Sequence, residues 1–198
     1  MARTIAKDHD EKRRLILTRA ARIFAEDGFD RASVSRVAQA CEISKANIYH
    51  YYSSKDDILF DILGSYLSAL RDRICEMDIA ALPPAEQLSA TVREIMLAYQ
   101  GADDEHRLQA SSIRYLPPAQ QTVLRSYQVD LVRHVDNIIA NIAPEVFDGD
   151  KNKLRATTMS IYGMLNWFYM WNHGADTKAR EDYADLVSKL ALGGIAGL

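Results

Sequence analysis

Apolar residues recur three and four positions apart along most of the chain, and the alternating runs typical of β-strands are absent. This pattern predicts an all-α protein. Glycine and proline positions separate the periodic segments from one another. The first predicted helix ends at Gly28, and the others cover about residues 34–41, 45–51, 55–74, 84–99, 104–115, 123–142, 151–172 and 178–192.

Two of these helices are short and follow one another closely. Ser33 and Ser44 stand in the N-cap position of segments 34–41 and 45–51, where a serine hydroxyl can accept a backbone N–H. Two short helices joined by a tight turn and braced by a third are the components of a helix-turn-helix. The pattern therefore predicts a helix-turn-helix between Ser33 and Tyr52.

The second short helix has an unusual polar surface. Ile48 and Tyr52 are four residues apart and are expected to face inward. The side chains left outside contain donors and aromatic hydroxyls but no carboxylate: Lys45, Asn47, Tyr49, His50 and Tyr51. Lysine can donate to guanine and asparagine can pair with adenine in the major groove, while tyrosines and Lys55 can reach phosphates. These features favour DNA binding, and a solvated helix inside another bundle is the alternative.

The charge distribution supports a local DNA-binding segment, although the formal net charge is −3. Residues 1–55 contain eleven Lys and Arg against seven Asp and Glu, whereas residues 56–198 contain thirteen against twenty. A basic first quarter on an acidic remainder indicates a small DNA-binding domain. Chance clustering could give the same imbalance.

Several other classes of protein are disfavoured. No run of about 18 uncharged apolar residues predicts a membrane span, and the charged N-terminus is unlike a signal peptide, so we expect a cytoplasmic protein. The two cysteines form no disulfide or zinc pattern, and the five histidines have no metal-ligand spacing. No phosphate-binding glycine loop or nucleophile elbow occurs, so neither an enzyme nor a cofactor is expected.

The first third of the chain resembles the N-terminal region of the TetR/AcrR family of bacterial repressors. The resemblance covers about residues 12–60 and rests on segments 23–29 (IFAEDGF), 32–38 (ASVSRVA), 43–52 (ISKANIYHYY) and 55–59 (KDDIL). It implies about nine helices, with a DNA-binding domain at 1–55 and a ligand-binding and dimerisation domain at 56–198. It also implies a homodimer on a palindromic double-stranded DNA operator. The DNA-facing positions that it implies are Ser33, Ser35, Lys45, Asn47, Tyr49, His50, Tyr51 and Lys55.

This sequence departs from the family pattern within the helix-turn-helix. The family usually has glycine in the turn where Glu42 stands, and glycine tolerates a positive φ there. Glycine or proline is common at Ala46 and threonine at Asn47. The operator sequence therefore cannot be transferred from relatives.

The segment 162–171 contains five aromatic residues, and a helix apolar on all sides must be covered on all sides. Its Gly163-x-x-Asn166-Trp167 pattern is similar to TetR-like regulators of fatty-acid, aromatic-acid and sterol breakdown, which often sense coenzyme A thioesters. That resemblance suggests apolar pocket walls at Met96, Tyr99, Ile113, Tyr115, Leu124, Tyr127, Tyr162, Asn166 and Tyr169, with Arg107, Arg114 and Arg125 for phosphates. An ordinary core, and surface ion pairs for the arginines, are the alternatives.

The family resemblance also implies that the last two long helices of each subunit form the dimer interface. Apolar positions at suitable spacing are Leu154, Ile161, Leu165, Phe168, Tyr183, Leu186, Val187 and Leu190. Each could instead belong to the protein's own core. The predicted function is a ligand-responsive repressor released by a small apolar effector. A DNA-binding regulator without a small-molecule ligand is the main alternative, and an enzyme is a remote one.

Overall fold

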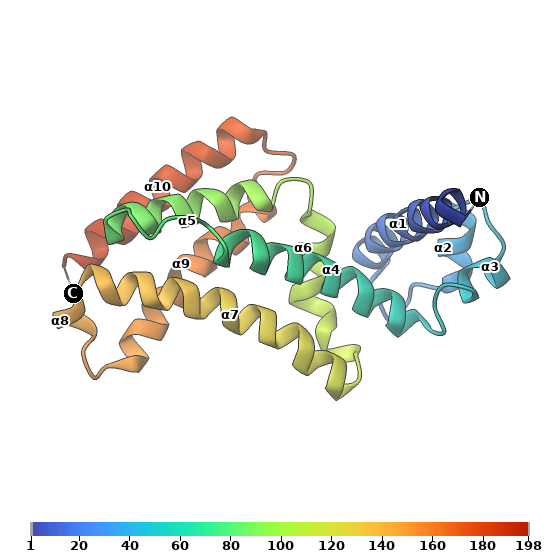
Figure 1. The fold of residues 1–198 in the computed structure, drawn as a ribbon, viewed down its shortest axis with the longest axis horizontal. Coiled ribbons are helices and arrows are strands. Elements are labelled where there is room, and N and C mark those ends of the chain that lie inside the picture. The colour runs from blue at the N-terminus through green and yellow to red at the C-terminus, as the bar shows by residue number, and fades with distance from the viewer. Residues whose placement is uncertain (1, 198) are drawn as a thin grey trace. The chain divides into compact units, whose positions relative to one another are not determined.

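The computed structural model describes residues 2–197, with side chains from His9 onward, and in that range it contains helices and no strand. The all-α prediction is confirmed. Ten α-helices and one 3₁₀ helix follow in order (Figure 1): α1 Ala2–Asp27, α2 Val34–Ala40, α3 Lys45–Tyr49, α4 Lys55–Cys75, α5 Pro84–Ala98, α6 Asp103–Ser112, η1 Ile113–Tyr115, α7 Pro118–Ile142, α8 Pro144–Phe147, α9 Lys151–Trp171 and α10 Thr177–Ile195.

The chain forms two compact units. Unit 1 comprises the residues up to Leu67 together with Asp104–Leu124, and unit 2 comprises Ser68–Asp103 together with the residues from Arg125 onward. The helices α4, α6 and α7 contribute residues to both units. The unit that holds the helix-turn-helix is therefore larger than the segment 1–55.

Serine caps define the helix starts in unit 1. The hydroxyls of Ser33 and Ser44 accept the N–H groups of Arg36 and Asn47, which are the third residues of α2 and α3. Ser54 caps α4 in the same way, through the N–H of Asp57 at 3.0 Å. Each cap satisfies one of the backbone donors that a helix start leaves unpaired.

Two predicted helices end differently in the structure, and one short helix was not predicted. The helix expected at 45–51 ends at Tyr49, and the next two residues form a turn in which the Tyr51 N–H donates to the Ile48 carbonyl at 2.9 Å. The helix expected at 104–115 tightens into η1 before Pro117. The one-turn helix α8, which begins at Pro144, was not predicted.

The core of unit 1 is built on α1, α2, α3 and the first half of α4. Its fully buried side chains include Ile16, Phe24, Val37, Ile48, Ile58, Leu59 and Leu63. The segment 104–124 adds three contacts: Tyr66 shares a hydrogen bond with His106 Nδ1 at 3.1 Å, Tyr115 lies 5.6 Å from the Phe29 ring, and Leu124 lies beside Gly64. Ile48, which anchors α3, is fully buried in this core.

In unit 2 the helices α5, α9 and α10 all contact one another, and α5 and α10 lie side by side in Figure 1. Its buried apolar side chains include Leu88, Val92, Ile95, Met96, Leu131, Val135, Ile139, Ile161, Leu165, Phe168, Ala184 and Val187. Two tyrosine hydroxyls are paired inside it. Tyr99 donates to Asn166 Oδ1 at 2.8 Å, and Tyr162 donates to the Leu131 carbonyl at 3.0 Å. Burial raises the pKa of both phenols.

The turn between α2 and α3 contains a strained residue. Glu42 has φ 56°, and it is the one non-glycine residue with a positive φ in residues 2–197. An L-residue in this conformation costs about 1–2 kcal/mol because Cβ approaches the backbone. The glutamate therefore occupies a position suited to glycine, as the comparison with the family pattern suggested.

We predict that Glu42→Gly stabilises the protein by about 0.5–1 kcal/mol, because the relieved strain exceeds the greater freedom of glycine in the unfolded chain. Urea unfolding measures the effect. The matched control is Gln39→Gly, an exposed position within α2, which should destabilise by about 1 kcal/mol. Equal destabilisation by both substitutions would contradict the strain at Glu42.

Candidate nucleic-acid interface

The helix α3 presents a polar face on a buried anchor. Ile48 is fully buried, whereas Lys45, Tyr49 and His50 are exposed and Asn47 is half-buried. The Lys45 ammonium lies 5.8 Å from the centre of the Tyr49 ring, so these two side chains share one side of the helix. No carboxylate lies on α3 itself. The helix can therefore offer donors to base edges and phosphates.

The other predicted DNA-facing residues of the helix-turn-helix lie nearby in the sequence. Ser33 and Ser35 are exposed at the start of α2, and Ser33 also caps that helix. Tyr51 is half-buried just after α3, where its ring stacks on His9. The contacts of all three with DNA remain predictions.

One carboxylate connects three parts of unit 1. Asp61 on α4 accepts two hydrogen bonds from Arg13 of α1, from Nε at 3.0 Å and from Nη2 at 2.6 Å. It also accepts the Tyr52 hydroxyl at 2.6 Å and the Ser65 hydroxyl at 3.3 Å. Burial, and this hydrogen bond to Asp61, raise the pKa of Tyr52. Because Tyr52 closely follows α3, Asp61 fixes α3 relative to α1 and α4. This second helix of the predicted helix-turn-helix is called the recognition helix below.

Lys55 has a different role from the predicted phosphate contact. Its ammonium donates to the carbonyls of Phe29, Ala32 and Asp30, at 2.6, 3.0 and 3.2 Å respectively. It also lies 4.4 Å from the centre of the Phe29 ring. An ammonium has three N–H donors, so these carbonyls occupy all of them. Lys55 therefore holds the loop between α1 and α2, and its ammonium has no N–H left for a DNA phosphate.

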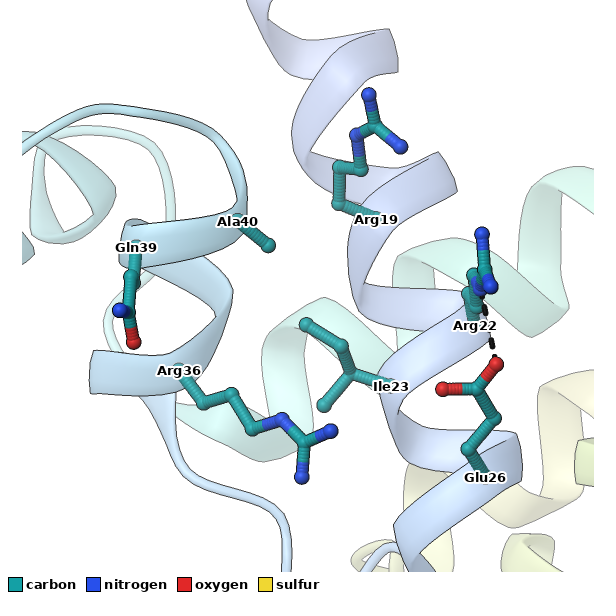
Figure 2. Close-up of a pocket in the computed structure, with 7 residues that line it drawn as sticks. All are labelled: Arg19, Arg22, Ile23, Glu26, Arg36, Gln39 and Ala40. Atoms are coloured by element: carbon teal, nitrogen blue, oxygen red, sulfur yellow. Dashed lines mark hydrogen bonds and ion pairs between the residues drawn. The ribbon is translucent and has the colours of Figure 1, made fainter.

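A second set of bonds joins α1 to α2. Arg36 forms an ion pair with Asp27, and Arg31 Nε donates to the Asp27 carbonyl at 2.8 Å. Beside them lies a cavity of about 290 Å³ between the two helices, lined by Arg19, Arg22, Ile23, Glu26, Arg36, Gln39 and Ala40. Figure 2 shows Ile23 pointing toward α2 across this space, and the bond between Arg22 and Glu26 at its edge. No residue of α3 lines this cavity, so the cavity is separate from the polar face of α3.

The predicted effector-binding residues divide between the two units. Unit 1 contains Arg107, Ile113, Arg114, Tyr115 and Leu124, and unit 2 contains Met96, Tyr99, Arg125, Tyr127, Tyr162, Asn166 and Tyr169. Within unit 1, Arg114 and Tyr115 are exposed, with the Arg114 guanidinium over the Tyr115 ring, so they do not line the interior of that unit. In unit 2, the bond between Tyr99 and Asn166 brings two predicted residues together. Arg71 lies over the Tyr127 ring at 5.2 Å.

The burial of several predicted dimer-interface residues corrects that part of the prediction. Ile161, Leu165, Phe168 and Val187 are 1–3% exposed inside unit 2, so they cannot contact a second subunit unless that unit opens. Leu154 and Tyr183 are half-buried, and Tyr183 stacks on Phe168 at 4.5 Å. Leu186 and Leu190 are exposed by 51% and 56%. Only these two remain fully available for an interface.

Three residues that organise the interface were not found from the sequence: His9, Arg13 and Asp61. His9 pairs with Tyr51, 42 positions away, and Arg13 with Asp61, 48 positions away, and no local pattern links either pair. Within the described residues, no three His, Cys, Asp or Glu side chains gather as metal ligands do. No helix among them is long and apolar enough to cross a membrane.

Profiles of known protein families match both the N-terminal and the C-terminal part of the chain. A family profile described as bacterial regulatory proteins, tetR family, matches residues 16–62, and one described as tetracyclin repressor-like, C-terminal domain, matches residues 81–195. The regulator YuxN of Bacillus subtilis, which is uncharacterized, is 27% identical over 135 residues. The match spans 65% of this chain but only 45% of YuxN.

Two solved structures have a similar fold. A TetR-family transcriptional regulator from Bordetella parapertussis 12822 superposes with a TM-score of 0.86 at 27% identity, over 94% of this chain and 96% of that one. AibR in complex with isovaleryl coenzyme A and operator DNA gives a TM-score of 0.77 at 21% identity, over 90% and 97% of the two chains. At this low sequence identity, the similarity to AibR shows that the two proteins share a fold.

Two lysines of unit 1 provide a matched test of these assignments. We predict that Lys55→Met lowers the free energy of unfolding by about 2 kcal/mol, because hydrogen bonds to a charged group contribute about 1.5–3 kcal/mol. The same replacement at the exposed Lys45 should leave unfolding unchanged and weaken operator binding by about 1–3 kcal/mol. Urea unfolding and fluorescence anisotropy measure the two effects. If Lys55→Met weakened only DNA binding, the structural role of Lys55 would be wrong.

Proposed function

Because the chain belongs to the TetR family of bacterial regulatory proteins, we propose that it is a ligand-responsive repressor that binds a palindromic operator as a homodimer. The family consists of DNA-binding transcriptional regulators, so the protein is a regulator and not an enzyme. The effector that we propose is an acyl- or aryl-coenzyme A thioester, whose acyl or aryl group is the apolar part that the protein would bind. The protein would act in the cytoplasm, where operator DNA is accessible.

The polar face of α3 is the observation that carries the DNA-binding half of this proposal. Exposed Lys45, Tyr49 and His50 project from a helix whose Ile48 is fully buried. A rigid anchor matters because base recognition requires donors held in a fixed orientation. Two such helices, one from each subunit, would enter major grooves about one helical turn apart.

Exposed apolar side chains on α9 and α10 support the homodimer. Met159, Trp167, Met170 and Trp171 on α9, and Leu186 and Leu190 on α10, are 43–61% exposed. Met159, Gly163, Trp167 and Trp171 follow one another at intervals of four, so they form a stripe along one side of α9. An exposed apolar surface of this kind marks an association site. A second copy fits it because a symmetric pair covers both stripes at once.

Buried polar groups on α5 and α9 support a ligand inside unit 2. The two helices run in the same general direction (Figure 1), and the bond between Tyr99 and Asn166 joins them. Thr91 and Thr158 lie eight residues before that pair on their respective helices. Both hydroxyls are fully buried, and neither has a hydrogen-bond partner. Unpaired buried hydroxyls are costly, and a polar group of a ligand, such as a thioester carbonyl, would pair with them.

The bound effector of AibR suggests which compounds to test. Operator DNA is first selected from a random pool, and its affinity is then measured with isovaleryl, longer acyl and aromatic coenzyme A thioesters, with free coenzyme A as control. We expect at least one thioester to weaken operator binding by about tenfold or more, within the usual range of allosteric coupling. Thr91→Val and Thr158→Val should reduce that response without destabilising the free protein. No response to any thioester would refute the proposed effector class and leave DNA binding intact.

The homodimer is tested by charge substitution on α10. Leu186→Glu with Leu190→Glu should convert the dimer to a monomer at micromolar concentration, because each leucine contributes about 2 kcal/mol by burial and occurs twice in a symmetric interface. Analytical ultracentrifugation measures the mass. Leu82→Glu, at an exposed loop position before α5, is the control and should remain dimeric. A dimer that survives the double substitution would require a different interface.

A further inference from the structure

The helix α1 extends beyond the part of the chain that the family profile matches. That match begins at residue 16, whereas α1 begins at Ala2. Within the extension, His9 stacks on Tyr51, with ring centroids 4.7 Å apart and an interplanar angle of 30°. Tyr51 lies just after the recognition helix and is one of the predicted phosphate contacts. The extension therefore lies beside the proposed DNA-binding surface.

The stack is held in place by a neighbouring ion pair. Arg13, one helical turn after His9, forms two hydrogen bonds to Asp61 at 2.6 and 3.0 Å. Asp61 also accepts the hydroxyl of Tyr52, the residue after Tyr51. The same carboxylate thus holds Arg13, one turn from His9, and Tyr52, next to Tyr51, so it restrains the two segments that carry the rings.

The charged groups around His9 leave the Nε2 side of its imidazole ring accessible to a ligand. Its Nδ1 is 3.9 Å from the Asp10 carboxylate on its own helix, and the two side chains are 57% and 67% exposed. On the α3 side it faces the neutral Tyr51 ring, with His50 next in sequence, and Arg13 and Asp61 neutralise each other. In the described part of the chain, no hydrogen bond or ion pair is formed by His9 Nε2.

We propose that His9 is a further phosphate-binding residue of the DNA interface, whose imidazolium contacts an operator phosphodiester beside Tyr51. This inference rests on the proposed DNA binding by α3. A phosphate stabilises the protonated ring, so complex formation takes up a proton and operator affinity rises as pH falls through the range where histidines titrate.

The test compares the full-length protein with His9→Phe, which retains a flat ring for the stack but removes the charge. Operator affinity is measured by fluorescence anisotropy at about pH 6 and about pH 8, values on either side of the ordinary histidine titration. We expect the wild-type protein to bind several-fold more tightly at the lower pH, and His9→Phe to lose most of that gain. At the lower pH, operator affinity should also depend less steeply on salt concentration in the variant than in the wild-type protein. The difference should correspond to about one phosphate contact.

His173→Phe is the control, because His173 is an exposed residue of unit 2 and belongs to no proposed site. This variant should retain the full pH response of the wild-type protein. Thermal unfolding of His9→Phe should match that of the wild-type protein, which excludes loss of fold as the cause. A full pH response in His9→Phe, or its loss in His173→Phe, would overturn the proposal. Absence of operator binding by the wild-type protein at either pH would instead refute the proposed function.

Discussion

The ammonium of Lys55 holds the loop between α1 and α2, and the shape of the DNA-facing surface depends on that loop. Phe29, Asp30 and Ala32 each direct a carbonyl toward it. The bonds to Phe29 and Ala32 are partly buried, and an acceptor left unpaired there would cost free energy. Lys55 also begins α4, only a few residues after α3. One side chain therefore couples the start of α2 to the end of the recognition helix.

A recognition helix of five residues needs such support. Isolated helices of this length are unstable in water, because nucleation is costly and few hydrogen bonds follow it. The Ser44 cap, the fully buried Ile48 and the bond from Tyr52 to Asp61 hold α3 at its start, middle and end. Its conformation is therefore imposed by the rest of unit 1. Outward side chains on a helix held in this way have well-defined positions, which sequence-specific recognition requires.

Local features of the sequence predicted most of the fold. Apolar spacing located the long helices, serine caps located the starts of α2, α3 and α4, and the Glu42 turn has the positive φ that its place in the family pattern suggested. Long-range contacts were less accessible. A lysine that reaches a loop 23–26 residues away has the same local sequence as one that reaches a phosphate. Likewise, the periodicity of α9 identified apolar positions but not which of them face unit 2, because that helix is apolar on several sides.

The positive charge of the N-terminal segment gives an incomplete picture of how unit 1 would hold DNA. Arg13, Arg22 and Arg36 pair with carboxylates of the same unit, and Lys55 is bonded to backbone carbonyls. These cations stabilise the fold, and their charge is largely neutralised before DNA arrives. On α3 and in the two residues after it, Lys45 is the cation, accompanied by the amide of Asn47, the phenols of Tyr49 and Tyr51, and the imidazole of His50. Neutral donors and acceptors act over short distances and in fixed directions. Recognition by this face would consequently depend more on the orientation that Asp61 and Lys55 impose than on the number of basic residues in the segment.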